Sequence, residues 1–119
     1  MSLEQRLVKI AFKMKNIILL DFSFPGNKFL EFKKIYDNRY ISIPCRKDFA
    51  VNYASGLSTF GKNIVVYGLE PINVEKMIHN EDSTLNIKIL REVPNGDWDD
   101  FEAEISAFGG KLLLIPIED

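Results

Sequence analysis

The run Ile17-Ile18-Leu19-Leu20-Asp21-Phe22 would place apolar side chains on both faces of any strand it forms. A strand of this kind is buried on two sides, as is the central strand of a parallel sheet covered by helices. Pro25-Gly26-Asn27 follows the run and supplies turn residues. This segment therefore predicts an α/β fold built around a buried parallel sheet.

Further apolar runs alternate with helical patterns along the chain. The expected strands are 17–22, 39–44, 64–67, 85–90 and 112–117, and the expected helices are 3–14, 29–35, 47–60, 74–79 and 97–108. Ser2 is the expected N-cap of the first helix. This order predicts a three-layer, doubly wound, mostly parallel five-stranded sheet with helices on both faces. The length of 119 residues predicts one domain spanning 1–119.

Composition narrows the classes of partner. The formal net charge is −2, so the chain lacks the basic excess typical of nucleic-acid binding. No segment approaches the roughly 20 apolar residues of a membrane span, and the first residues lack the pattern of a signal peptide. The lone Cys45 favours a reducing compartment. We therefore expect a cytoplasmic protein with no nucleic-acid or membrane partner.

Standard catalytic and metal motifs are absent from the sequence. It contains neither the dinucleotide motif GxGxxG nor the phosphate-binding GxxxxGK[ST]. His79 is the only histidine, and its polar surroundings favour a solvated helix end. One Cys and one His cannot form a structural zinc site. The acidic residues between 97 and 104 are interpreted as a solvated helix face, so no metal site is predicted.

Two other sources of chemistry receive little support. A phosphorelay receiver domain would need an Asp after the third strand and a Lys after the fifth, and neither is present. Cys45 has Arg46 and Lys47 beside it, which would lower a thiol pKa. It has no evident base to pair with, so a loop cysteine is the favoured interpretation.

The central part of the chain carries a more specific pattern. Residues 48–67 read DFAVNYASGLSTFGKNIVVY, and residues 91–95 read REVPN. This small-residue helix, the Gly-Lys step, the β-branched strand and the R-x-x-P-N stretch resemble the pyrimidine-binding (PYR) domain of transketolases and deoxyxylulose-phosphate synthases. The order of elements is also similar over nearly the whole chain, including an apolar strand that ends in Asp21.

The resemblance implies thiamine diphosphate chemistry, with departures at the key positions. In that family a Glu at the start of the helix hydrogen-bonds the aminopyrimidine of the cofactor; here Lys47 occupies that position. Asp48 is the nearest carboxylate and is the candidate catalytic residue. Leu69, followed by Glu70, stands where the family has an aromatic that stacks on the pyrimidine. The candidate cofactor-binding residues are Asp21, Lys47, Leu69 and Glu70.

Three hypotheses follow. The first is a PYR-like domain that does not catalyse by itself, binds no cofactor alone, and has a structural or regulatory role. The second is a subunit of a split thiamine diphosphate-dependent enzyme, completed by a separate diphosphate-binding chain. The third is an unrelated doubly wound module whose ligand lies at loops 21–27, 44–48 and 68–72. The expected partners are a second copy in a homodimer or a diphosphate-binding-domain protein.

Overall fold

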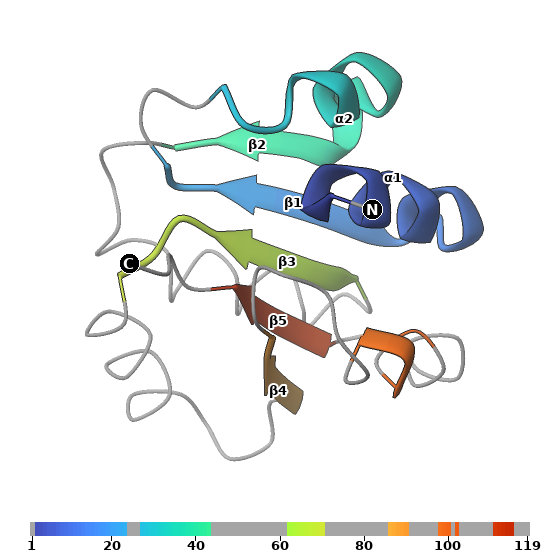
Figure 1. Ribbon diagram of the computed structural model, residues 1–119, viewed down its shortest axis with the longest axis vertical. Coiled ribbons are helices and arrows are strands. Elements are labelled where there is room, and N and C mark those ends of the chain that lie inside the picture. Colours follow the sequence, from blue (N-terminus) through green and yellow to red (C-terminus); the bar gives the residue numbers. More distant parts are fainter. Residues whose placement is uncertain are drawn as a thin grey trace.

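The computed structural model describes residues 2–23, 27–43, 62–70, 86–90, 98–100, 102 and 111–115. The expected helices at 47–60 and 74–79 lie outside the described residues, as do the turns expected at 25–26 and 94–96. Within the described part, strands form one sheet with helices packed against it (Figure 1).

Helix α1 (Leu3–Lys13) begins and packs as its sequence predicts. The Ser2 hydroxyl accepts from the Gln5 backbone N–H, and the Gln5 side chain accepts from the Ser2 N–H, so the expected N-cap is confirmed as a reciprocal capping box. Four apolar residues of the helix are buried against the sheet: Leu3, Leu7, Ile10 and Ala11. Each fully buried Leu or Ile stabilises the fold by about 1.5–3 kcal/mol.

The strands lie close to their expected positions. They are β1 (Ile17–Asp21), β2 (Tyr40–Ser42), β3 (Asn63–Tyr67), β4 (Asn86–Ile89) and β5 (Lys111–Ile115). Between β1 and β2 the chain forms α2 (Leu30–Ile35) and a 3₁₀ turn, η1 (Asp37–Arg39). The turn takes up Arg39, so β2 begins one residue later than the strand expected at 39–44.

The sheet has the strand order β2-β1-β3-β5-β4, and every neighbouring pair of strands is parallel. The chain moves from β1 to β2 on one side, and β3 then lies on the other side of β1. This reversal creates a topological switch point between the carboxyl ends of β1 and β3. The predicted α/β fold with a parallel sheet is confirmed.

Both faces of the central strands are buried. On one face, residues of β1, β3 and β5 pack with α1, Phe29, Phe32 and Trp98. On the other face, Leu20, Ile64, Val66 and Leu114 form a second cluster with Phe22 and Leu69. All five residues of β3 are buried, as expected for a strand covered front and back.

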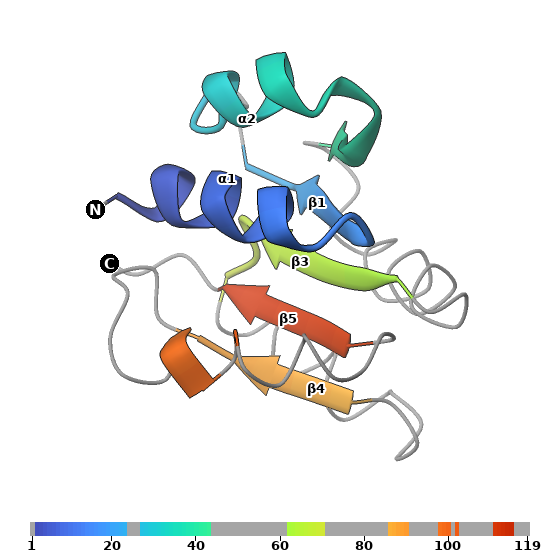
Figure 2. The ribbon, with the colours of Figure 1, turned by 90° about the vertical axis from the view of Figure 1, so that its right-hand side faces the viewer.

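The described helices lie side by side on one face. Figures 1 and 2 both show α1 between α2 and the helical segment near residue 100. Trp98 in that segment is fully buried in the same core cluster as α1. In the described part of the chain, no helix has the length and apolar character needed to cross a bilayer.

Candidate functional site

The candidate site lies at the switch point, where β1 and β3 end beside each other. Asp21, the last residue of β1, is in register with Tyr67, the last residue of β3. The Phe22 N–H then donates to the Tyr67 carbonyl at 2.8 Å. The fold thus brings Asp21 and the segment containing Leu69 and Glu70 to one edge of the sheet, as their positions after parallel strands predict. Lys47 and Asp48 lie outside the described residues.

Asp21 is fully buried, and both of its carboxylate oxygens accept hydrogen bonds. Oδ1 accepts from the Ser23 backbone N–H at 2.9 Å and from the Ser23 hydroxyl at 2.5 Å. Oδ2 accepts from the Tyr40 hydroxyl at 2.6 Å. A buried carboxylate needs such partners, because an unpaired one would be strongly destabilising. The side chain therefore joins β1, its following loop and the edge strand β2.

Tyr40 is the buried partner of Asp21 from the neighbouring strand β2. Its side chain is buried, and its pKa is raised well above the usual value, first by that burial and then by the hydrogen bond to Asp21 and the charge of that carboxylate. A hydrogen bond from Ser42 acts in the opposite direction. The tyrosine consequently keeps its proton and remains a donor to the carboxylate throughout the neutral range.

Gly68 brings the two loops of the switch point into backbone contact. Its φ of +100° lies in the region that favours glycine. A Cβ atom added there would meet the Ser23 nitrogen and would lie 2.8 Å from the Phe22 carbonyl carbon. Only glycine lets the chain after β3 approach the chain after β1 this closely, so Gly68 contacts the main chain of Phe22 and Ser23.

Leu69 and Glu70 differ in their surroundings. The Leu69 side chain is 2% exposed and belongs to the core cluster on the second face of the sheet. Glu70 is exposed. Of the three candidate cofactor-binding residues that the structure describes, two are therefore parts of the core, and only Glu70 is presented to solvent.

Aromatic packing fixes the start of α2 against the end of β3. The rings of Phe29 and Tyr67 meet edge to face, with 5.0 Å between centroids. The Lys28 ammonium lies 5.2 Å from the centroid of Tyr67. Tyr67 is buried on the face covered by α1 and α2. Its ring is thus enclosed by these neighbours and is not a free stacking surface.

The thiamine diphosphate implied by the resemblance can be tested against these residues. A pyrimidine site needs a carboxylate free to share a proton and an apolar or aromatic surface open to the ring. The carboxylate of Asp21 already holds Ser23 and Tyr40, and Leu69 is enclosed in the core. The described candidate residues do not fit the cofactor. Across all the residues that the structure describes, there is also no group of three or more His, Cys, Asp or Glu side chains that could hold a metal ion.

Sequence reasoning identified Asp21, and the loops 21–27 and 68–72 of the third hypothesis contain Ser23 and Gly68, but neither residue was given a role and Tyr40 was missed. Gly68 directly follows a β-branched strand, which is a local signal for an unusual backbone conformation. Tyr40 offers no such signal, because its contact with Asp21 depends on the parallel pairing of β1 with β2. Ser23 lies two residues from Asp21, a spacing at which Asp side chains often bind the backbone in turns.

Comparisons with known proteins identify the fold. No protein-family model matches the sequence, and neither does any curated protein. A solved structure described as "Split gene transketolase, inactive beta4 tetramer" is similar, with a TM-score of 0.69 and 11% sequence identity over 98% of this chain. The resemblance to transketolases is confirmed at the level of the fold. This chain spans 51% of that solved chain.

Proposed function

We propose that this chain is a single PYR-like domain of the transketolase fold that does not catalyse by itself and has a structural or regulatory role. The observation that carries the proposal is the state of Asp21, whose two carboxylate oxygens are bound by Tyr40 and Ser23 inside the fold. Two features of the sequence support it: Lys47 stands at the position of the family's Glu, and Leu69 stands at that of its stacking aromatic. Lysine is a cation with donors only, so it cannot share a proton as the carboxylate does.

The proposal includes a three-layer arrangement, with helices on both faces of the sheet. It also includes a cytoplasmic location, as expected from the sequence. The burial of Ile64, Val66 and Leu114 requires that something cover the second face of the sheet. The helical patterns at 47–60 and 74–79 are our candidates for that layer. The α1 face is covered by α1, α2 and the segment near residue 100. A doubly wound domain would result.

Association is the second part of the proposal. The solved chain with the similar fold is described as a tetramer. We propose that this chain forms a homodimer or pairs with a diphosphate-binding-domain protein. A domain without a free cofactor site could still hold an assembly together, because association depends on its outer surface and not on Asp21.

Isothermal titration calorimetry tests the cofactor part. Thiamine diphosphate titrated into the full chain in the presence of Mg²⁺ should give no saturable heat. Glu70→Gln is the matched variant, since Glu70 is the exposed member of the candidate residues. Tight, Mg²⁺-dependent binding that Glu70→Gln weakens would overturn the proposal and would assign Glu70 to the site.

A second candidate function is supported by the words "split gene" in the description of the similar structure. On this alternative, the chain is the PYR subunit of a thiamine diphosphate-dependent transferase, completed by a separate diphosphate-binding chain, and Asp48 acts on the pyrimidine. Co-purification with such a chain, followed by a transketolase-type assay, tests it. Asp48→Asn should abolish the activity of the complex; an active Asp48→Asn complex would remove Asp48 from that role.

A further inference from the structure

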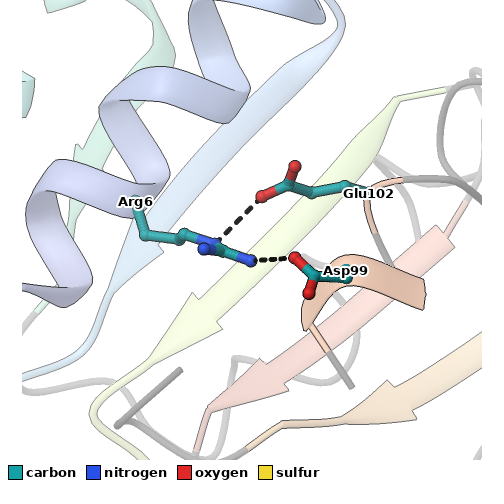
Figure 3. A network of polar contacts seen from close by, with 3 residues as sticks. All are labelled: Arg6, Asp99 and Glu102. Carbon is teal, nitrogen blue, oxygen red and sulfur yellow. Dashed lines mark hydrogen bonds and ion pairs between the residues drawn. The ribbon is translucent and has the colours of Figure 1, made fainter. Parts of the chain in front are cut away.

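We draw no further inference here: the strongest candidate, the side-chain cluster of Arg6, Asp99 and Glu102 between α1 and the segment near residue 100 (Figure 3), carries nothing because its charges pair with one another and hold those two elements together.

Discussion

The two ends of the central strand β1 are held by polar groups of opposite charge. At the amino end, the Arg39 side chain donates to the carbonyls of Ala11, Met14 and Ile17 at 2.7–3.0 Å and stacks on the Tyr36 ring, with 4.6 Å to the centroid. At the carboxyl end, Asp21 accepts from Ser23 and Tyr40.

The difference lies in what each group binds. Arg39 contacts main-chain carbonyls, including the last ones of α1, where a cation also complements the helix dipole. Any sequence with the same backbone would offer those carbonyls. Asp21 depends on the hydroxyls of two particular side chains and on the close approach that Gly68 permits. The contacts at the carboxyl end of β1, where ligands of α/β folds bind, therefore depend more on particular side chains than the contacts at its amino end do.

The largest effect is expected from Gly68→Ala. The new Cβ would meet main-chain atoms of Phe22 and Ser23, which cannot rotate away as a side chain could, and the residue would need a φ of +100°. We expect a loss of about 3 kcal/mol or more in the free energy of unfolding. Urea denaturation measures it. A change below about 0.5 kcal/mol would show that the loops at this end are not held together as described.

Arg39→Met should have the next largest effect. The substitution keeps an apolar stem against Tyr36 but removes all three donors, which leaves carbonyls at the end of α1 and the start of β1 without their partner. We expect a loss of about 2–4 kcal/mol. The matched control is Lys34→Met on the exposed side of α2, which should change stability by less than about 0.5 kcal/mol.

Tyr40→Phe should cost about 1–3 kcal/mol, because it removes the donor to Asp21 Oδ2 and leaves that buried oxygen without its hydrogen bond. Tyr36→Phe is the matched control, since its hydroxyl makes a longer bond of 3.2 Å to a carbonyl in a less buried place. The account of the carboxyl end would be wrong if the two variants lost equal stability.

The same pair predicts a pH dependence. The pKa of Tyr40 is raised in the folded chain, whereas an unfolded tyrosine titrates near pH 10. Above about pH 10 the unfolded chain therefore loses a proton that the folded chain keeps, and stability falls as pH rises. The contribution is fully present below that pH. Denaturation measured between pH 8 and 11 should show that the free energy of unfolding falls more steeply with pH for the wild-type chain than for Tyr40→Phe.

The smallest effect concerns the start of α2, which has no side-chain cap of its own. Glu4 of α1 supplies one, because its Oε2 accepts from the backbone N–H groups of Glu31 at 3.0 Å and Phe32 at 3.3 Å. Glu4→Ala should cost about 0.5–1 kcal/mol. Glu31→Ala should cost less, and thermal unfolding monitored by circular dichroism would separate the two.

Local sequence patterns were sufficient for much of the fold. The apolar runs indicated the positions of β1 and β3, and Ser2 marked the start of α1. The strand order could not be predicted in the same way, because no local pattern says that β3 lies on the opposite side of β1 from β2. The 3₁₀ turn at Asp37–Arg39 also carries no strong signal, and it positions Arg39 under α1.

The site was less predictable than the fold, for a physical reason. Asp21 was identified as a candidate cofactor-binding residue through the resemblance to the PYR domain, as the last residue of an apolar strand. Whether such a carboxylate binds a ligand or the protein itself depends on partners that are distant in sequence, here Tyr40 on the neighbouring strand. The caps of α2 by Glu4 and of α1 by Arg39 are likewise long-range contacts. The roles proposed for Lys47 and Asp48 remain predictions.

Amide hydrogen exchange at Phe22 and Ser23 tests most directly whether the carboxyl end of β1 is closed by its own polar contacts. The Phe22 N–H is bound to Tyr67 and the Ser23 N–H to Asp21, so both should exchange only when the sheet opens, at the rate of the central strand. Adding thiamine diphosphate and Mg²⁺ should leave both rates unchanged. Fast exchange at both amides without ligand, followed by protection when the cofactor is added, would contradict the account.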